Sequence, residues 1–528
     1  MSELQQILRR SVAGCLLICI SGIGPMACVS VECDGADVFC DPFALILYRL
    51  AVEPDCLVRG ETPATGWLSF SGSSGEDEFA TSICGMRDGT VLLAGQANDV
   101  NPTTQGIAPL IPFTGAPTDT NVVIYQVDGA GSLKRWSHFG AAGVQLLGVK
   151  VAEAPDGFFA VASASAGFQI QGLSPRVAHQ GGTSDIAVMR FDANLNLLWF
   201  TFIGSSGNEV PADIVPTGDG GLMILGRTSA AHSIQGVSPL QPYLGGIEVV
   251  LYYLNSTGSV DWFSFFGTAG NDTPTAISRV PLEPILVGQS AGFDQFVFAS
   301  IIAQDIPEYA GQTPIRAYSG GSDIAIARVD RSGLISQYGF YGTAASETIS
   351  SLCVARSGDI YLGGGSSANI AVFDGLAPLT PYSGNADGWL VRLNAAGSVR
   401  SHRFLGSSIV DTIQGLSESP GGDLLVGMSL GATATLGITP AYANSGVRDG
   451  ALIRIDPNDT IQAFAYYGGT AAESILSFAP TADGGAVLGG EAPSPAFSAP
   501  SGVPILEAYA GSSDEFYLRV FADGRTIR

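Results

Sequence analysis

Short apolar runs alternate with turn residues along most of the chain. In the clearest stretch, Leu222–Thr228 and Glu248–Asn255 are rich in β-branched and aromatic residues, and Ser259–Gly267 is an aromatic run. Gly218–Gly221 and Ser256–Gly258 separate these runs. Runs of this kind bounded by Gly, Asp and Asn are typical of strands joined by tight turns. Beyond the N-terminus no segment keeps a helical apolar period over three turns, so the pattern predicts an all-β protein.

The same unit recurs seven times, and each copy opens with an apolar-glycine corner, which in the first copy is spaced by one residue as Phe70-Ser71-Gly72. The spacing of these corners is roughly 62 to 75 residues, a period typical of repeat architectures. Each copy predicts four strands, named A to D here: A follows the corner, B follows an Asp-Gly turn, C begins at an acidic or amide residue, and D carries aromatics. The corner glycines are Gly72, Gly140, Gly204, Gly267, Gly342, Gly406 and Gly468.

Seven four-stranded antiparallel units predict a closed seven-bladed β-propeller, with an open solenoid as the alternative. The first copy consists of a D strand alone, at Gly66–Gly72, and the last copy ends after its C strand, at Glu515–Phe521. We therefore expect Trp67–Ser71 to pair with Glu515–Phe521 and complete the seventh blade. Closure would hide two strand edges that otherwise promote aggregation. The propeller is expected to span residues 66–528.

The C strands also carry arginines, which point to ion pairs. Arg190 and Asp192 share one face of their strand, so we expect a surface ion pair contributing roughly 0 to 1 kcal/mol.

The loops between strands B and C are expected to form the recognition face, together with the D–A corners. They are long and rich in Gly, Pro and Ser, and binding residues concentrate on long loops of a rigid scaffold. His179 and His232 fall in adjacent B–C loops, and we interpret them as solvent-exposed loop residues, with a meeting on the recognition face as the alternative. The candidate contact residues on this face are His179, His232, Tyr243, Tyr309 and Tyr382.

A second motif fills these loops. It reads QGIAPLIPFTG at residues 105–115, QGVSPLQPYLGG at 235–246 and DGLAPLTPYSG at 374–384. Together with GGSDIAIARVDRSG at 320–333 and the corner FFGTAGND, the chain resembles the bacterial β-propeller-repeat family known as SBBP. The resemblance covers about Trp67 to Arg528. It implies a secreted or surface protein and carries over no catalytic residues.

Residues 1–27 are interpreted as an export signal. Arg9 and Arg10 precede an apolar segment, Val12–Ile23, that is too short to span a bilayer. Ala27 and Cys28 then resemble a lipoprotein signal, in which Cys28 is acylated after cleavage; plain secretion and a retained anchor are the alternatives. We therefore expect an exported protein held at the cell envelope by lipid.

Residues 28–65 are interpreted as a cysteine-containing linker. In an oxidising compartment we expect a Cys40–Cys56 disulfide, because it would close a small loop over the apolar run Phe43–Leu50. Zinc is disfavoured, since no second cysteine pair or nearby histidine completes a site. Cys84 and Cys353 occupy the same register of two A strands and are expected to be buried thiols.

Charge and motifs narrow the function further. The formal net charge is −24 at pH 7, which argues against nucleic-acid binding. Cationic ligands or Ca²⁺ suit that charge better, but no metal site is assigned, because Ca²⁺ takes 6–8 oxygens and the corner acids lie on separate blades. Those acids are expected to accept backbone hydrogen bonds or to bind cations weakly. They are Asp77, Glu209, Asp272, Glu347, Asp411 and Glu473.

No metalloprotease motif, phosphate loop or serine elbow is present, so no catalytic residue is predicted. We expect a binding platform for a protein or glycan ligand. The alternatives are a propeller enzyme of the glycan hydrolase or lyase type, with its site at the central mouth, and a structural spacer.

Overall fold

The computed structural model describes residues 15–20, 27–32, 56–58, 66–71, 79–98, 103–116, 118–170, 172–281, 294–432, 434, 436–493, 503–506, 508–509 and 514–525. The chain forms two compact units. The first comprises Met1–Glu53 and Pro281–Phe293, and the second comprises Pro54–Val280 and Asp294–Arg528. In the first unit, β1 (Cys15–Ile20) pairs antiparallel with β2 (Ala27–Glu32). None of the helices in the described residues has the length and apolarity needed to cross a membrane.

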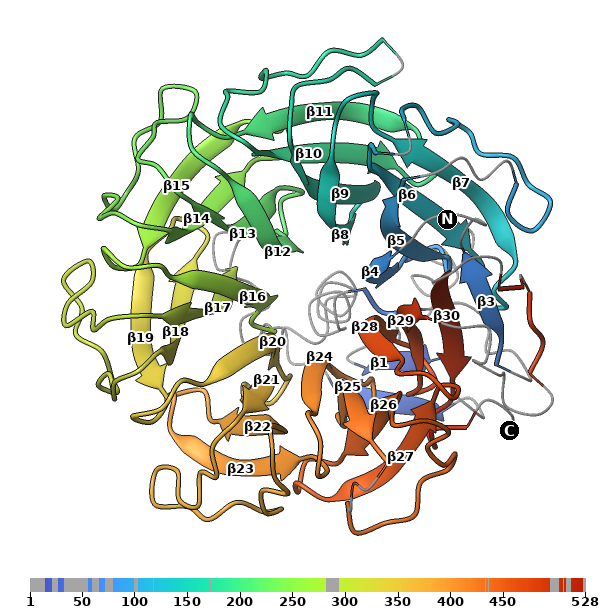
Figure 1. Cartoon of the computed structure of the whole chain (residues 1–528), viewed down its shortest axis with the longest axis vertical. Helices are drawn as coiled ribbons and strands as arrows, with labels where there is room; N and C mark the ends of the chain where they lie inside the picture. The colour runs from blue at the N-terminus through green and yellow to red at the C-terminus, as the bar shows by residue number, and fades with distance from the viewer. Residues whose placement is uncertain are drawn as a thin grey trace. The chain divides into compact units, whose positions relative to one another are not determined.

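The second unit is a ring of seven four-stranded antiparallel blades, as predicted (Figure 1). Six of the blades run from an inner A strand to an outer D strand in chain order. The first four blades are β4–β7 (Phe79–Gly85, Val91–Ala97, Asn121–Val127, Leu133–Phe139), β8–β11 (Leu146–Ala154, Gly157–Ala164, Asp185–Asp192, Leu197–Ile203), β12–β15 (Val210–Pro216, Leu222–Thr228, Glu248–Leu254, Val260–Phe266) and β16–β19 (Thr273–Arg279, Gln295–Ile302, Asp323–Asp330, Ile335–Tyr341). Two more are β20–β23 (Thr348–Val354, Ile360–Ser366, Asp387–Leu393, Val399–Leu405) and β24–β27 (Thr412–Glu418, Leu424–Gly431, Arg448–Ile455, Ile461–Tyr467).

The seventh blade joins the two ends of the repeat region. It consists of β28 (Ser474–Pro480), β29 (Ala486–Ala492), β30 (Asp514–Val520) and, as its outermost strand, β3 (Leu68–Ser71). β3 pairs antiparallel with β30 from Leu68↔Leu518 to Ser71↔Glu515, and the two lie side by side in Figure 1. The predicted closure of the ring by the N-terminal strand is therefore confirmed.

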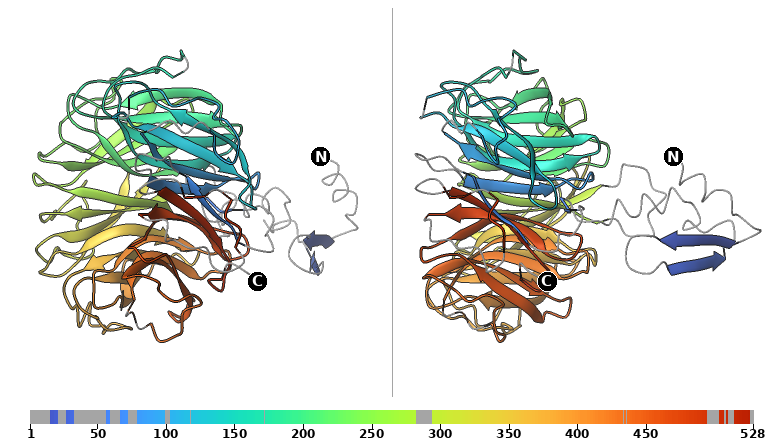
Figure 2. Two further views of the ribbon diagram at one scale, coloured as in Figure 1. Left: turned by 45° about the vertical axis from the view of Figure 1, so that its right-hand side comes forward. Right: turned by 90° about the vertical axis from the view of Figure 1, so that its right-hand side faces the viewer.

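Apolar side chains on both faces of the blades hold the ring together. The sheets pack face to face around it, as the side views show (Figure 2). One core cluster, for example, joins Phe159 and Val188 of the second blade to Ile224 and Tyr252 of the third. Burying such a side chain contributes roughly 1.5–3 kcal/mol, which explains why strands with almost no polar face are stable here.

Hydrogen bonds link the inner strands in four pairs of neighbouring blades. The A strands carry a β-bulge, and the side chain after the bulge accepts a backbone N–H from an A strand of an adjacent blade. The bonds are Val151 N to Ser82 Oγ (3.1 Å), Ile277 N to Asp213 Oδ2 (3.0 Å), Leu416 N to Ser351 Oγ (2.9 Å) and Ile83 N to Ser477 Oγ (3.0 Å). The last of these connects the seventh blade to the first.

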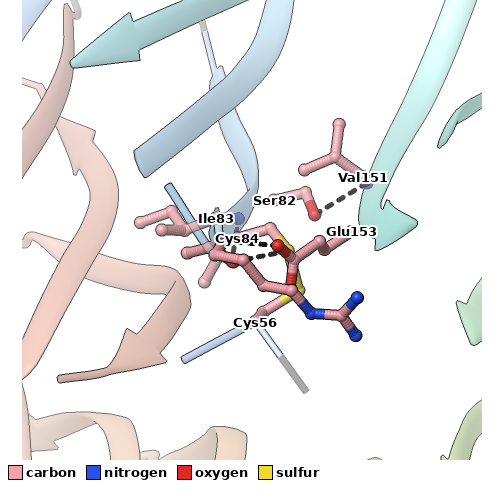
Figure 3. Close-up of a disulfide and its surroundings, with 9 residues drawn as sticks. Cys56, Ser82, Ile83, Cys84, Val151 and Glu153 are labelled. Carbon is pink, nitrogen blue, oxygen red and sulfur yellow. Dashed lines mark hydrogen bonds and ion pairs between the residues drawn. A yellow bond between two sulfur atoms is a disulfide. The ribbon is translucent and has the colours of Figure 1, made fainter. Parts of the chain in front are cut away.

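A disulfide fastens the segment before the ring to the first blade. Cys56 is bonded to Cys84 at the end of β4, with Cα atoms 4.3 Å apart (Figure 3). The predicted Cys40–Cys56 bridge is therefore wrong, as is the free thiol at Cys84; Cys40 lies outside the described residues. The physical reason is the path of the chain: Gly85 N donates to Cys56 O, and Val58 N donates to Pro480 O, each at 2.9 Å.

Cys353 matches its prediction as a buried free thiol. Burial raises its pKa to about 12, so the thiol stays protonated and is shielded from oxidants.

Candidate functional site

Among the described residues, four B–C loops contain a tight two-residue turn near their start. At Gln105-Gly106 both residues have positive φ, 46° and 75°, and Thr104 and Ile107 exchange backbone hydrogen bonds of 3.0 and 2.9 Å. Positive φ at both central positions defines a type I′ turn, in which glycine is strongly preferred. The same conformation recurs at Gln235-Gly236, Ala310-Gly311 and Asp374-Gly375. The recurring Gln-Gly pair is therefore a turn signal.

Beyond this turn the loop runs along the outermost strand of its own blade. Its backbone N–H donates to a D-strand carbonyl four residues before each corner. These bonds are Leu110 N to Trp136 O, Leu240 N to Phe263 O, Ile315 N to Tyr338 O and Leu379 N to His402 O, each 2.9 Å, and Leu506 N to Leu68 O at 2.8 Å. The loops thus cover the exposed edges of the sheets, where free N–H and C=O groups would invite pairing with other chains.

Two of the predicted loop tyrosines fasten the loop to its blade. The Tyr243 hydroxyl donates to Ser229 O (3.1 Å) and Gly246 O (2.6 Å). Tyr382 makes the same pair of bonds to Ser367 O and Asn385 O. Tyr318, which the sequence analysis missed, is their true equivalent in the fourth blade, where it bonds to Ala303 O (2.9 Å) and Gly321 O. Aligning the residue two positions before the Gly-Gly or Gly-Asn pair would have found it.

Tyr309, the other predicted tyrosine, sits on a different part of the loop. It precedes the type I′ turn, and its hydroxyl donates to Phe265 O and lies 3.1 Å from Ser264 Oγ. Burial raises its pKa. Its hydroxyl therefore holds the loop against β15 of the preceding blade.

The two loop histidines are also built into their blades and are not brought together. His179 takes the tyrosine position in the second blade: its Nε2 lies 3.2 Å from Ala164 O and its Nδ1 accepts Gly181 N at 3.1 Å. His232 stacks on Phe263, with ring centroids 5.2 Å apart. Their side chains are only 10% and 3% exposed, so the interpretation as exposed loop histidines is wrong. Burial lowers the pKa of His232.

Four corner acids accept hydrogen bonds within their own corner. Glu209 Oε2 accepts Ser205 N and its Oε1 accepts Ser205 Oγ, both at 2.8 Å. The same arrangement of a backbone amide and a hydroxyl joins Thr268 to Asp272, Thr343 to Glu347, and Ser407 to Asp411. All four acids are buried. Asp77 lies outside the described residues.

A second acid, the first residue of the preceding C strand, approaches each of these corners. A Cβ on Gly342 would lie 2.4 Å from Asp323 Oδ1 and 2.8 Å from Glu347 Oε2, so glycine is required there. Burial, with a smaller contribution from the neighbouring acid, raises the pKa of Asp323 to about 6, of Asp387 to about 6 and of Glu248 to about 7. Each blade junction of this kind therefore holds two buried carboxyl groups. The sequence analysis noted both positions but did not pair them.

The C-strand arginines bind the A–B turns. Arg190 pairs with Asp156 and is 5% exposed, so the predicted surface pair with Asp192 is wrong. Asp192 instead accepts the amides of Asn194 and Asn196 at 2.8 and 2.9 Å. Equivalent 2.6 Å ion pairs join Arg392 to Asp359, Arg454 to Asp423 and Arg519 to Asp483. These arginines stabilise their blades.

An enzyme site at the central mouth was one alternative. Asp213, on the innermost strand β12, instead has a structural role. Both carboxylate oxygens of Asp213 accept backbone amides, from Ile214 at 2.9 Å and Ile277 at 3.0 Å. Burial raises its pKa, and the charge of Lys150 on the adjacent strand lowers it. Within the described residues, no group of three or more His, Cys, Asp or Glu is placed to hold a metal ion.

The B–C loops expose many aliphatic side chains to solvent. Among the described residues, most of the exposed large aliphatic side chains lie in B–C loops, distributed over all seven blades. They are Leu110, Leu173, Leu240, Leu244, Ile315, Val372, Leu379, Ile438, Val447 and Ile505.

No protein-family model and no curated protein sequence matches the chain. Solved structures resemble it at low identity. Sqt1 from Chaetomium thermophilum is 13% identical, covering 81% of this chain and 97% of its own, with a TM-score of 0.39. The polysaccharide lyase Uly1 is 10% identical over 84% and 90%, with a TM-score of 0.39. A protein of unknown function from Dyadobacter fermentans is 9% identical over 86% and 98%, with a TM-score of 0.36. The likeness concerns the fold alone.

Proposed function

We propose that the protein is an exported, lipid-anchored bacterial propeller that binds a protein or glycan ligand through its B–C loops. The observation that carries this proposal is the concentration of exposed aliphatic side chains on those loops. Exposed apolar groups gathered on one set of elements are typical of interaction surfaces. Hydrogen bonds to the D strands and tyrosine hydroxyls hold the loops in one conformation, which lowers the entropy lost on binding.

The N-terminal sequence and the resemblance to SBBP repeats support the location. Cys28 follows an apolar segment and a small residue, as in lipoproteins. With a net charge of −24 the protein gains nothing from anionic lipid surfaces, so stable attachment to a membrane would depend on acyl chains.

The binding claim is tested with matched surface variants. The loop variant combines Leu244→Ser, Val372→Ser and Val447→Ser, whose wild-type side chains are 59%, 63% and 68% exposed. The control is Leu334→Ser, 60% exposed in a C–D turn. Fluorescently labelled protein is titrated onto intact bacterial cells and immobilised polysaccharides. We expect the loop variant to bind at least about tenfold more weakly, since each buried aliphatic side chain contributes 1.5–3 kcal/mol. Equal binding by all three proteins would refute the proposal.

The location is tested separately. Intact-cell labelling followed by mass spectrometry of the mature N-terminus should find a processed, acylated Cys28 at the cell envelope. Cys28→Ser should release the protein from the membrane fraction. An unprocessed Met1 in the cytoplasmic fraction would refute the proposed location without bearing on the loop surface.

A further inference from the structure

Among the described junctions that carry a corner acid, one breaks the pattern of corner hydrogen bonds. In four junctions the residue after the corner glycine is Ser or Thr, and its hydroxyl donates to the corner acid: Ser205, Thr268, Thr343 and Ser407. Between the sixth and seventh blades this residue is Gly469, which has no hydroxyl. The corner acid there, Glu473, is fully buried, and neither of its carboxylate oxygens has a hydrogen-bond partner.

The acid facing Glu473 is left unsatisfied as well. Asp449, the first acid of its C strand, is 0% exposed; its Oδ2 accepts Ser445 N at 2.8 Å, but its Oδ1 has no partner. The two acids meet at the corner: a Cβ on Gly468 would lie 2.6 Å from Glu473 Oε2 and 2.7 Å from Asp449 Cγ. Three unpartnered carboxylate oxygens therefore lie around one buried corner.

Backbone carbonyls add to this oxygen cluster. A Cβ on Gly446 would lie 2.4 Å from Ala471 O, 2.8 Å from Gly469 O and 3.2 Å from Asp449 Oδ1. Carbonyls approach the equivalent glycine in other blades too, at Gly321 for example. What sets this junction apart is that acceptor oxygens are crowded together without the hydroxyl donor found elsewhere.

Such a cluster needs a positive partner. Two buried carboxyl groups that share a single hydrogen-bond donor, Ser445 N, are strongly disfavoured unless a proton or a cation compensates them. Burial raises the pKa of Glu473; the nearby Gly469 amide, which does not reach hydrogen-bond geometry, lowers it, and the Asp449 charge raises it further. Carboxylates combined with backbone carbonyls are the ligands that Ca²⁺ prefers, and a proton shared by the two acids is the alternative.

We propose that Asp449 and Glu473, with the carbonyl oxygens of Gly469 and Ala471, bind one Ca²⁺ ion between the sixth and seventh blades. The site would fasten the last complete blade to the one that closes the ring. Two carboxylates are few for a calcium site, so the dissociation constant should fall in the weak class of extracellular sites, about 10⁻⁴–10⁻³ M. That range suits a protein exported to a calcium-containing medium.

Terbium luminescence gives the direct test. Tb³⁺ replaces Ca²⁺ and is excited through nearby aromatic rings. Tyr466 is such a ring: burial raises its pKa, and so do the nearby charges of Asp411 and Asp449. In the purified, chelator-treated mature protein we expect Tb³⁺ emission that Ca²⁺ displaces. About 10 mM Ca²⁺ should also raise the thermal midpoint by roughly 1–3 °C.

Three variants decide between this site and its alternatives. Glu473→Gln should abolish both effects, and glutamine is tolerated at the equivalent Gln145. Gly469→Ser keeps both acids but restores the hydroxyl, so it should weaken Ca²⁺ binding at least about tenfold; the backbone at Gly469 is not left-handed, so serine fits. Glu347→Gln, at a junction with its hydroxyl, should change neither effect.

Two results would overturn the proposal. One is a wild type without displaceable Tb³⁺ emission and with a thermal midpoint indifferent to Ca²⁺, which would mean that the two acids share a proton. The other is a Ca²⁺ response that Gly469→Ser and Glu473→Gln leave intact. If Glu473→Gln fails to fold, Gly469→Ser still separates these outcomes.

Discussion

At the scale of single residues, the corner glycines that the structure describes leave no space for a larger side chain. Gly342→Ala would place a Cβ 2.4 Å from Asp323 Oδ1 and 2.8 Å from Glu347 Oε2. Overpacking of this kind costs about 1–3 kcal/mol. We expect a correspondingly lower free energy of unfolding in urea. Gly421→Ala is the matched control, because its added Cβ would meet nothing nearer than Ser419 Oγ at 3.7 Å. Equal stability of the two variants would contradict this account of the corner.

The buried carboxyl pairs predict how stability depends on pH. Burial raises the pKa of Glu248 to about 7 in the folded protein, so between its ordinary pKa near 4.5 and about 7 the folded state holds a proton that the unfolded state has lost. The resulting stabilisation is full below about pH 4.5 and is lost as the pH rises through 7. Glu248→Gln should remove roughly 2–3 kcal/mol of this pH dependence.

Urea unfolding at about pH 5 and about pH 8 measures this effect. Wild type should be less stable at the higher pH, partly through Asp323 and Asp387, whose pKa values shift in the same direction. A wild type that becomes more stable toward about pH 8 would contradict the assignment of raised pKa values.

Residue-scale reasoning from sequence found the corner acids but not their partners. Asp323 and Glu347 stand 24 positions apart in two different repeats, and only the packing of one blade on the next brings them to Gly342. The ion pair of Arg190 shows the same difficulty. Strand alternation predicted Asp192, two positions away, as its partner, whereas in the fold its partner is Asp156 of the A–B turn. Local spacing predicts which side chains share a face, but not which neighbouring turn approaches that face.

At the scale of elements, the Cys56–Cys84 disulfide ties the segment at residues 56–58 to the end of β4. The residues it joins are 28 positions apart, and a loop of that size predicts about 3.6 kcal/mol of stabilisation from restricting the unfolded chain. Cys84→Ser should lower the free energy of unfolding by about that amount, and a reducing agent should destabilise wild type but not the variant. Cys353→Ser is the control, since that thiol is free. A wild type indifferent to reduction would contradict the bridge.

This bridge could not be derived from the cysteine pattern. Cys40 and Cys56 formed the shorter loop, and nothing in the sequence shows that residues 56–58 run between the first and seventh blades. That path depends on backbone bonds from Gly85 to Cys56 and from Val58 to Pro480, which exist only once the ring has closed. The hydrogen bonds of the B–C loops were hidden from the sequence for a similar reason. Their length suggested recognition loops, and nothing in their composition showed that a segment of each loop bonds to its D strand.

At the scale of the whole molecule, the number of blades and the closure of the ring could both be predicted from the sequence. Seven corners with one frame of strands predicted seven blades, and a lone D strand at one end with a missing D strand at the other predicted closure. The structure confirms both predictions, and the junction between the seventh and first blades has the same kind of contact as another junction of the ring. Trp67 Nε1 donates to Gly129 O of the next blade at 3.1 Å, as Trp262 Nε1 donates to Arg331 O at 2.8 Å within the ring. The closing junction therefore repeats an ordinary one.

Closure should also determine whether the propeller stays soluble. A variant lacking residues 1–53 keeps Cys56 and β3, and should be a folded monomer, because the second compact unit begins at Pro54. A variant lacking residues 1–71 loses β3 and the disulfide, and leaves the outer edge of β30 without its strand partner. Unpaired edges recruit other chains, so this variant should form oligomers or aggregate.

Light scattering and size-exclusion chromatography compare the two truncations, and adding Cys84→Ser to the shorter deletion separates the effect of the disulfide from that of the strand. If the disulfide alone mattered, this combined variant would aggregate as readily as the one lacking β3. We expect it to remain monomeric with a lower free energy of unfolding, because the disulfide acts mainly on the unfolded chain whereas β3 covers an edge in the folded one. A monomeric, stable protein without residues 1–71 would show that hydrogen bonds between β3 and β30 are not what seals the ring.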